Sequence, residues 1–395
     1  MLEIRTENLL DREVKDMNNW VTAQLSDFIQ FKNGRKRPAE RGKIPVYGGN
    51  GILDYTDTAN QENSVIIGRV GAYCGSVYYE PAKHWVSDNA ISAASKCTSD
   101  IVYDYYLLKS LNLNHRHIGT SQPLLTQEIL NSIVVNLPPL DEQIEIGRTL
   151  RLLDEKIVNN TAINHHLEQM AQAIFKSWFV DFEPFGGEMP NDWQKGMLGD
   201  YCSVKSGFAF KSSWWQESGI RVIKIKNITD NGFNFTGCSC VSEDKIIYAK
   251  DFTTTAGDLL IAMTGATIGK FAIIPQHNEI LLINQRVGKF FLGTNPLMKL
   301  PFLWCLLRQD EVFNEIVNRG QGSAQPNISP TDIMTISIIL PSEGALLNFN
   351  DSLRSCFETM IANSAENQKL ADLRDTLLPR LMSGELSVAD LGDAK

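Results

Sequence analysis

Two long stretches of the chain carry apolar residues at the three- and four-residue spacing of a coiled-coil heptad. The positions of the first seam are Ile146, Leu150, Leu153, Ile157, Asn160, Asn164, Leu167, Ala171, Ile174 and Trp178. Those of the second are Phe349, Leu353, Cys356, Met360, Asn363, Asn367, Leu370, Arg374, Leu377 and Leu381. Both seams are largely apolar toward their ends and hold two asparagines near the middle, which predicts two paired helices whose asparagines fix the register.

The order of the segments favours antiparallel pairing of the two helices. The first leads from one half of the chain to the other, and the second begins at the far end of the second half. Antiparallel pairing places Asn160 opposite Asn367, Asn164 opposite Asn363, and Trp178 opposite Phe349. Leu153 then faces Arg374, an unfavourable layer unless the guanidinium extends outward to solvent. The alternative is that each helix packs only on its own domain.

The chain also aligns with itself, which indicates an internal duplication. The segment WVTAQLSDFIQFKNG (Trp20 to Gly34) aligns with WQKGMLGDYCSVKSG (Trp193 to Gly207). SVIIGRVGAYCG (Ser64 to Gly75) aligns with DLLIAMTGATIG (Asp258 to Gly269). QPLLTQEILNSIVVNLP (Gln122 to Pro138) aligns with QPNISPTDIMTISIILP (Gln325 to Pro341), and this last alignment continues without a gap into the long helices. The second copy therefore contains a longer insertion.

Each half combines strand-length apolar runs, such as VIIG and ISIIL, with segments of helical spacing such as YDYYLLKSL. We therefore predict an α+β fold: two mixed α/β domains separated by two long helices that form an antiparallel coiled coil, with an internal pseudo-two-fold repeat. The proline- and glycine-containing stretch between the halves is the linker. The expected order is an N-terminal extension (1–18), a first domain (19–140), the first helix (141–183), a linker (184–191), a second domain (192–342), the second helix (343–385) and a tail (386–395).

Composition excludes several classes of protein. Hydrophobic residues make up 43% and charged residues 21% of the 395, which is ordinary for globular domains. No apolar run is long enough to span a membrane, and the charged start does not resemble a signal peptide, so we expect a cytoplasmic protein. The seven cysteines include no C-x-x-C pair, which argues against a zinc site or a disulfide framework.

Net charge argues against nucleic-acid binding, but its distribution argues for it. The formal charge is −9, whereas DNA-binding domains usually carry a basic excess. Basic residues nevertheless cluster in KNGRKRPAERGK (Lys32 to Lys43), and a second group surrounds Lys224. Taken alone, each cluster is also typical of a solvated surface.

In combination, several motifs resemble the specificity subunits of type I restriction-modification systems. They are IPVYGGNGILDY (Ile44 to Tyr55), LPPLDEQIEIGRTLRLLDEKI (Leu137 to Ile157), LEQMAQAIFKSWFVDFEPF (Leu167 to Phe185), GDLLIAMTGATIGK (Gly257 to Lys270) and LRDTLLPRLMSGELSV (Leu373 to Val388). The resemblance implies a non-catalytic DNA-binding subunit with two target-recognition domains, each reading one half of a gapped asymmetric site on double-stranded DNA. It also implies that the helices set the gap.

The same resemblance implies partners. Two modification (methyltransferase) subunits, which carry S-adenosylmethionine, would dock on the helices, and restriction subunits would join them to cleave DNA. No cofactor and no membrane is expected for this chain itself. The second half departs from the pattern where its helix begins, since PSEGALL replaces PPLDEQI, so docking there is expected to differ in detail.

Candidate DNA contacts are polar and basic residues on loops, because arginine reads guanine and asparagine or glutamine reads adenine. In the first domain they are Lys32, Arg35, Lys36, Arg37, Asn50, Arg69, Tyr73, His115, Arg116, His117, Ser121 and Gln122. In the second domain they are Lys205, Lys211, Lys224, Lys226, Asn227, Thr264, Thr267, Lys270, Asn318, Arg319, Gln321, Ser323 and Gln325.

No catalytic or metal site is predicted. NLPPL (Asn136 to Leu140) lacks the aromatic residue of an amino-methyltransferase loop, and the glycine loops lack phosphate-loop spacing. His115 and His117, His165 and His166, and Cys238 and Cys240 have no further ligands nearby in sequence. The alternative function is a two-headed scaffold that bridges protein partners without sequence-specific DNA recognition.

Overall fold

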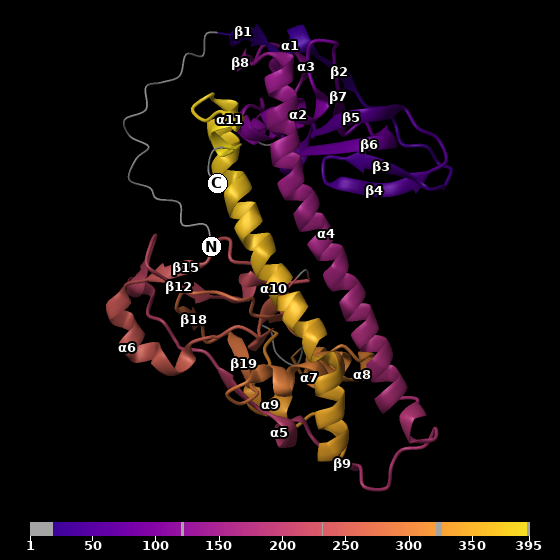
Figure 1. Ribbon diagram of the computed structural model, residues 1–395, viewed down its shortest axis with the longest axis vertical. Helices are drawn as coiled ribbons and strands as arrows, with labels where there is room; N and C mark the ends of the chain where they lie inside the picture. Colours follow the sequence, from indigo (N-terminus) through magenta and orange to yellow (C-terminus); the bar gives the residue numbers. More distant parts are fainter. Residues whose placement is uncertain (1–18, 120–121, 231, 321–325, 393–395) are drawn as a thin grey trace. The chain divides into compact units, whose positions relative to one another are not determined.

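The computed structural model describes residues 19–119, 122–230, 232–320 and 326–392 and separates into two compact units (Figure 1). Unit 1 contains the chain up to Lys156 and again from Leu370, and unit 2 contains Ile157–Lys369. Helices α4 (Leu140–Phe179) and α10 (Glu343–Met382), each 40 residues long, both pass from one unit to the other. The units thus divide within the long helices, whereas the sequence places domain boundaries at their ends.

Unit 1 is built on a six-stranded sheet in the order β2-β7-β5-β6-β3-β4, antiparallel except where β3 pairs with β6. The strands are β2 (Ile29–Asn33), β3 (Ile44–Gly48), β4 (Gly51–Thr56), β5 (Gln61–Gly68), β6 (Val77–Val86) and β7 (Ala90–Ser95). The short strands β1 (Val21–Gln24) and β8 (Val134–Leu137) form a separate pair. The helices are α1 (Leu25–Phe28), α2 (Ile101–Ser110), α3 (Gln127–Asn131) and α11 (Val388–Gly392).

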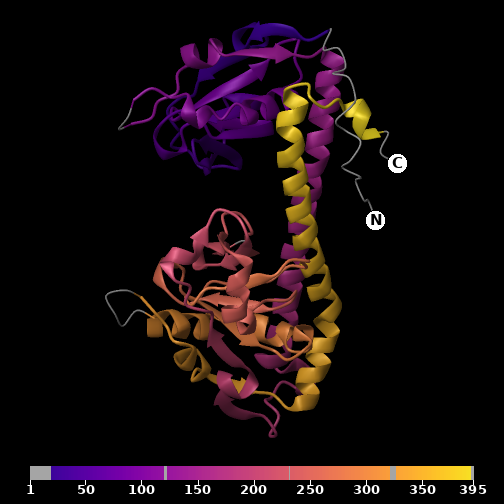
Figure 2. The ribbon, with the colours of Figure 1, turned by 90° about the vertical axis from the view of Figure 1, so that its left-hand side faces the viewer.

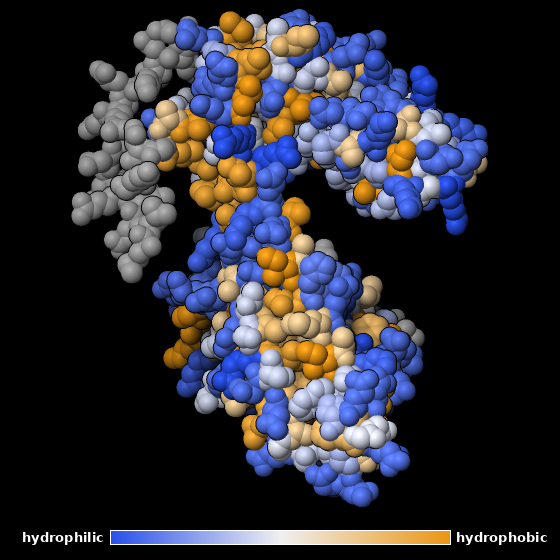
Figure 3. All heavy atoms as spheres, turned by 45° about the vertical axis from the view of Figure 1, so that its right-hand side comes forward, coloured by the Kyte–Doolittle hydropathy of each residue, from blue (hydrophilic) through white to orange (hydrophobic). Residues whose placement is uncertain are grey.

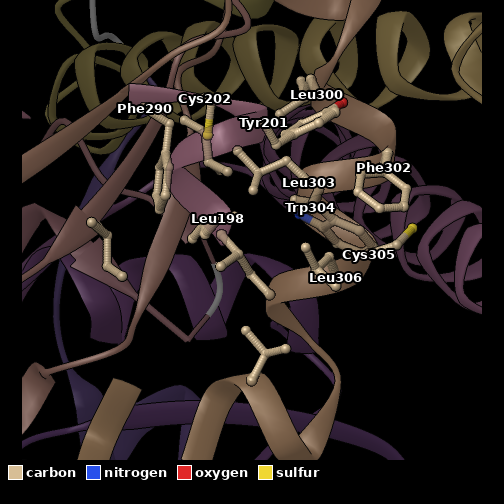
Figure 4. Packing of buried hydrophobic residues seen from close by; sticks show 14 of the residues in the cluster. Leu198, Tyr201, Cys202, Phe290, Leu300, Phe302, Leu303, Trp304, Cys305 and Leu306 are labelled. Carbon is tan, nitrogen blue, oxygen red and sulfur yellow. The ribbon is translucent and has the colours of Figure 1, made fainter. Parts of the chain in front are cut away.

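Unit 2 has two four-stranded sheets, in the orders β10-β19-β16-β17 and β11-β15-β12-β18, and two strand pairs, β13-β14 and β9-β20. The strands are β9 (Gln194–Met197), β10 (Ser203–Ser206), β11 (Trp215–Gln216), β12 (Ile220–Ile223), β13 (Ile228–Thr229), β14 (Gly232–Phe233), β15 (Ser239–Val241), β16 (Leu259–Ala262), β17 (Phe271–Ile273), β18 (Leu281–Ile283), β19 (Val287–Phe291) and β20 (Ser337–Leu340). The helices are α5 (Leu198–Tyr201), α6 (Ile246–Ala249), α7 (Leu300–Leu307), α8 (Asp310–Gly320) and α9 (Pro330–Met334). Side chains of α5, α7 and β19 interlock in its core (Figure 4).

The duplication read from the sequence recurs in the strand pairing. In unit 1 the strand after Trp20 pairs antiparallel with the strand before Pro138, and β9 pairs with β20 in the same way. The one-turn helix that follows is fixed alike in both copies, because the backbone N–H of Gln24 donates to Asp27 and that of Met197 donates to Asp200, each at 2.8 Å. The two aligned aspartates, Asp27 and Asp200, therefore cap equivalent helices. The predicted fold class with its internal repeat is confirmed.

The two long helices run antiparallel and side by side within each unit (Figures 1 and 2). In unit 2, Asn160 donates to Asn367 at 3.0 Å and to the Glu366 carboxylate at 2.6 Å, and Asn363 donates to Asn164 at 2.9 Å. The rings of Trp178 and Phe349 meet edge to face, 5.8 Å apart. These are the pairs that antiparallel packing predicts from the seam.

Each long helix contributes to the core of both units rather than to one domain. In unit 1, Ile146 and Leu150 of α4 share a buried cluster with Leu377 and Leu381 of α10. In unit 2, Ala171 and Phe175 of α4 share one with Phe349, Leu353, Phe357 and Met360 of α10. This overturns the alternative in which each helix packs on its own domain alone.

In the Leu153–Arg374 layer, which was expected to be unfavourable unless the guanidinium extends to solvent, the arginine stays within the structure. The side chain of Arg374 is only 17% exposed and forms an ion pair with Asp154. Asp154 also accepts a hydrogen bond from the Tyr106 hydroxyl of α2 at 2.7 Å. Asp154 and Asp375 together satisfy the largely buried guanidinium of Arg374, and the Tyr106 hydroxyl in turn satisfies Asp154.

The helices are anchored to their domains by different side chains. In unit 1, the buried Gln143 of α4 accepts from the backbone N–H of Asp100 and donates to the Pro138 carbonyl. In unit 2, Asn350 of α10 accepts from the N–H of Phe302 at 2.9 Å. Where PSEGALL replaces PPLDEQI, the second helix has no counterpart of Gln143. Asn350, one helical turn after the aligned position, anchors that helix instead.

A buried carboxyl in unit 1 makes its stability depend on pH. Asp104 accepts hydrogen bonds from Ser95 and Ser99, yet burial raises its pKa to about 7. Between the unfolded pKa of about 4 and about 7, the folded form holds a proton that the unfolded chain releases, so stability falls as pH rises through this window. We expect Asp104→Asn to flatten the decrease by up to about 1.4 kcal/mol per pH unit.

Urea unfolding of unit 1, followed between pH 4 and pH 8, measures this effect. The matched control is Asp57→Asn, at an exposed carboxyl of the same unit. Identical slopes for the wild type and Asp104→Asn would contradict the assignment.

The asparagine layers generate a second prediction. Replacing Asn160 and Asn164 with leucine removes their hydrogen bonds to Asn367 and Asn363 across the seam, so the free energy of unfolding should fall by about 1–3 kcal/mol. Leucine at all four asparagines should recover stability but loosen the register and allow chains to associate. Denaturation combined with light scattering tests both outcomes. If the variant with leucine at Asn160 and Asn164 is as stable as the wild type, the asparagine hydrogen bonds do not stabilise the helix pair.

Candidate DNA interface

The loops that carry most candidate residues of unit 1 meet at one end of its sheet. The N–H of Arg35, just after β2, donates to the carbonyl of Val86 at the end of β6 at 3.0 Å. The N–H of Arg69, just after β5, donates to Asn89 in the β6–β7 turn at 2.9 Å. The Ser76 hydroxyl donates to the carbonyl of Gly49 in the β3–β4 turn. Four loops that are distant in sequence therefore form one continuous surface.

The segment between α2 and α3 completes this surface. The N–H of Gly71 donates to the Pro123 carbonyl at 3.1 Å, and that of Leu125 donates to the Arg69 carbonyl at 2.9 Å. Gly75, at φ 87°, lies so close to Asn114 that a Cβ would be 2.3 Å from its nitrogen. The glycine-spaced loop is thus a structural bracket that holds neighbouring loops together and not a phosphate loop.

The structure brings Arg35, Asn50, Arg69, Tyr73, His115, Arg116, His117 and Gln122 to this surface. Lys32 lies on β2 itself, and Arg37 forms an ion pair with Asp54 at 3.4 Å. Arg69 and His117 are partly buried, and the other described candidates of this unit are exposed. Ser121 lies outside the described residues. In Figure 3, hydrophilic residues cover most of the sheet-bearing part of unit 1.

Unit 2 builds the same bracket from the aligned residues. The N–H of Gly207, after β10, donates to Val287 at 2.9 Å, and that of Met263 donates to Arg286 at 3.0 Å. The N–H of Gly265 donates to the Pro326 carbonyl at 2.9 Å, as that of Gly71 does to Pro123. The two units therefore present loops of equivalent backbone geometry.

Among the candidates of unit 2, Lys205, Lys211, Lys226 and Asn318 are exposed, and Thr264, Thr267 and Lys270 are partly buried. Lys270 forms an ion pair with Asp230 at 2.7 Å. Lys224 lies 3.6 Å from the centre of the Trp215 ring, and burial lowers its pKa. Gln321, Ser323 and Gln325 lie outside the described residues.

Two candidates form side-chain hydrogen bonds within unit 2 that give them a structural role. Asn227 is fully buried: its amide donates to the carbonyls of Asn234 and Thr236 and accepts from the N–H of Lys224. Arg319 donates to the Asp332 carbonyl and to the Thr335 hydroxyl, both at 2.7 Å, and pairs with Glu315. Both side chains are occupied in holding loops and helices of unit 2 together.

Sequence reasoning missed the turns at the middle of each surface. Asp88 and Asn89 in the β6–β7 turn, and Gln285 and Arg286 in the β18–β19 turn, are exposed. The backbone of each turn binds the glycine-spaced loop of its own unit. Aligning SDNAIS (Ser87 to Ser92) with NQRVGK (Asn284 to Lys289) would have revealed them, because each begins a strand of the repeat.

Catalytic and metal chemistry finds no support in the described part of the chain. No group of three or more His, Cys, Asp or Glu side chains is arranged to hold a metal ion there. Asp154 is committed to Arg374 and Tyr106, and burial raises the pKa of the Cys238 thiol. Within the described residues, no helix combines the length and apolar character needed to cross a bilayer.

Comparison with known proteins decides the family. The family model described as "Type I restriction modification DNA specificity domain" matches residues 17–169 and 190–345, which is most of the chain and one match for each half. The chain belongs to this family. The resemblance inferred from the motifs is therefore confirmed, as is the assignment to a DNA specificity subunit rather than an enzyme.

Individual specificity subunits align over most of their length. The type I restriction enzyme MjaVIII specificity subunit of Methanocaldococcus jannaschii is 25% identical, with 94% of each chain covered. The HindI specificity subunit of Haemophilus influenzae is 26% identical over 67% of this chain and 71% of its own. In fold, the chain is similar to the crystal structure of the type I S subunit from M. genitalium, with a TM-score of 0.63 at 18% identity, covering 93% and 98% of the two chains.

The reassignment of Arg319 is testable. Arg319→Met removes hydrogen bonds between α8 and α9, so the free energy of unfolding should fall by about 1–3 kcal/mol while the DNA sequence recognised stays the same. Asn318→Ala, at the exposed neighbouring position, is the control for stability. A stable Arg319→Met protein with altered DNA recognition would restore the original assignment.

Proposed function

We propose that this chain is the DNA-reading subunit of a type I restriction-modification complex and that each unit reads one half of a gapped, asymmetric DNA site. One observation carries this: the same bracketed loop surface is built twice, with different exposed side chains on each copy. Equivalent backbones dock equivalently on DNA, and unlike side chains select unlike bases.

Basic residues around each surface supply phosphate contacts. Lys32, Arg35 and Lys36 are exposed in unit 1, and Lys205, Lys211 and Lys226 in unit 2. The net charge of −9 opposes DNA binding by the chain alone. We propose that partner subunits close around the DNA and contribute the remaining phosphate contacts.

Those partners are two modification subunits, which bind S-adenosylmethionine and methylate adenine, and restriction subunits that cleave DNA. A groove in unit 1 between the start of α2 and α4 suits such a contact, lined by Asp100, Val102, Ile144, Arg148, Arg151, Leu152 and Glu155. Ile144 and Leu152 are 45% and 54% exposed, so they present apolar surface in this groove that a partner could bury. The complex would act in the cytoplasm, where it meets chromosomal DNA.

The alternative, a scaffold that bridges proteins without reading DNA, is not favoured. The family is defined by DNA specificity domains, and basic loop surfaces are the electrostatic footprint of DNA binding.

Mapping methylated adenines in a host that expresses the modification subunit, with and without this gene, tests the proposal. We expect methylation at one two-part asymmetric sequence only when the gene is present. The modification subunit alone is the control. Methylation without sequence preference in the assembled complex would contradict DNA reading and support the scaffold.

The spacing role of the helices gives a separate prediction. Inserting four residues after Lys156 in α4 and after Lys369 in α10 lengthens each helix by about 6 Å. The gap between half-sites should grow by one or two base pairs, each about 3.4 Å, with both half-sites unchanged. A four-residue insertion in the linker at 184–191 is the matched control and should leave the gap as it was. An unchanged gap with the helix insertions rules out a spacing role.

A further inference from the structure

The β6–β7 and β18–β19 turns have the same backbone hydrogen bonds in both units. The N–H of Ser87 donates to the carbonyl of Tyr47 at 2.9 Å, and that of Asn284 donates to Ile223 at 2.9 Å. A backbone hydrogen bond closes each turn. The N–H of Ala90 donates to the Ser87 carbonyl at 3.0 Å, and that of Val287 donates to the Asn284 carbonyl at 2.9 Å. A strand residue, Tyr47 of β3 or Ile223 of β12, therefore holds the first residue of each turn in place.

The ends of each turn are anchored, and its two middle side chains are free to face solvent. Ser87 and Ala90 are buried, whereas Asp88 and Asn89 between them are exposed. In unit 2, Val287 is buried and Gln285 and Arg286 are exposed. Within the described part of the chain, the Arg286 guanidinium takes part in no ion pair. Rigid backbone with exposed polar tips is the arrangement that positions a side chain for base reading.

Each turn also lies between the two other parts of its surface. On one side, its backbone carbonyl accepts a hydrogen bond from the glycine-spaced loop. The N–H of Arg69 donates to Asn89 in unit 1, and the N–H of Met263 donates to Arg286 in unit 2. On the other side it contacts the segment after the first sheet strand, where Gly34 and Gly207 leave no room for a Cβ against the turn backbone. The turn is therefore at the centre of the loop surface, and the basic segment lies beside it.

The side chains exclude a common phosphate-binding role. Asp88 occupies in unit 1 the place that Gln285 occupies in unit 2, and a carboxylate would repel a DNA phosphate. A carboxylate can instead accept from the amino group of cytosine, and asparagine pairs with adenine through two hydrogen bonds. Asn89 of unit 1 aligns with Arg286 of unit 2, so both turn positions differ between the units in the chemistry that base edges distinguish.

We infer that these two turns are sequence-determining elements: Arg286 reads a guanine in the half-site of unit 2, and Asn89 reads an adenine in the half-site of unit 1. The inference rests on the proposed DNA-reading function and adds to it which residues select which bases. Arg286 and guanine match through the bidentate contact of a guanidinium with O6 and N7.

The test compares Arg286→Ala, Arg286→Lys and Asn89→Ala in the full chain assembled with its modification subunit. Methylated adenines are mapped, and bound sequences are selected from a randomised DNA library. Gln276→Ala is the matched control, because Gln276 is exposed in the loop that precedes β18, at the opposite end of that strand from the turn. Lysine keeps the charge but not the fork geometry, so Arg286→Lys separates base reading from phosphate binding.

We expect both Arg286 variants to lose the preference for guanine at one position of one half-site, by about tenfold to a hundredfold, with the other half-site unchanged. Asn89→Ala should relax one adenine position in the opposite half-site. Gln276→Ala should leave every position intact. A variant too weak to methylate is judged on the library selection, at low salt where non-specific affinity is higher.

The inference is overturned if Arg286→Ala retains every selected base, or if Arg286→Lys behaves as the wild type and only Arg286→Ala weakens binding at all sequences alike. Absence of any sequence preference in the wild-type complex would instead refute the proposed function itself. The two failures are therefore distinguishable.

Discussion

Amide hydrogen bonds in the seam between α4 and α10 are the constraint on which the structure depends. Asn160 is buried and Asn164, Asn363 and Asn367 are partly buried, so the hydrogen bonds between these amides favour the antiparallel register in unit 2. The ion pair of Arg374 with Asp154 is the polar layer of the seam in unit 1. The same two helices supply buried residues to the core of each unit.

The second constraint is a set of backbone hydrogen bonds that joins the loops of each unit in the same way. A glycine after the first sheet strand, a glycine-spaced loop and a strand-connecting turn bind one another through backbone groups, so the geometry does not depend on exposed side chains. Side chains on this frame can change without altering the frame. For a family of DNA specificity domains, this separation of backbone support from side-chain chemistry is a physical basis for two unlike half-sites read by one chain.

Much of this architecture could be predicted from the sequence because heptad spacing and self-alignment are local signals. The facing asparagines and the Trp178–Phe349 contact followed from counting along the two seams. The parallel pairing of β3 with β6 and of β12 with β18 could not be predicted, since the short strands carry no signal of partner choice. The turn residues were missed because SDNAIS and NQRVGK were not aligned with each other, although each begins a strand of the repeat.

Side-chain roles were less predictable than elements. Asn227 and Arg319 are residue types that commonly read bases. Their side chains instead donate hydrogen bonds to backbone carbonyls that only the folded chain brings close. The Leu153–Arg374 layer was expected to be unfavourable because the partner of the arginine, Asp154, lies off the seam and Tyr106 lies on another helix. A loop residue becomes interpretable only when the neighbouring loops are known.

The most direct test of the account exchanges one recognition domain. Residues 19–140 are replaced by the equivalent segment of a family member that recognises a different sequence, and the methylated adenines are mapped by sequencing. The account predicts that one half of the recognised site changes to that of the donor, with the other half and the gap retained. A change in both halves, or in neither, would contradict the claim that each unit reads its own half-site.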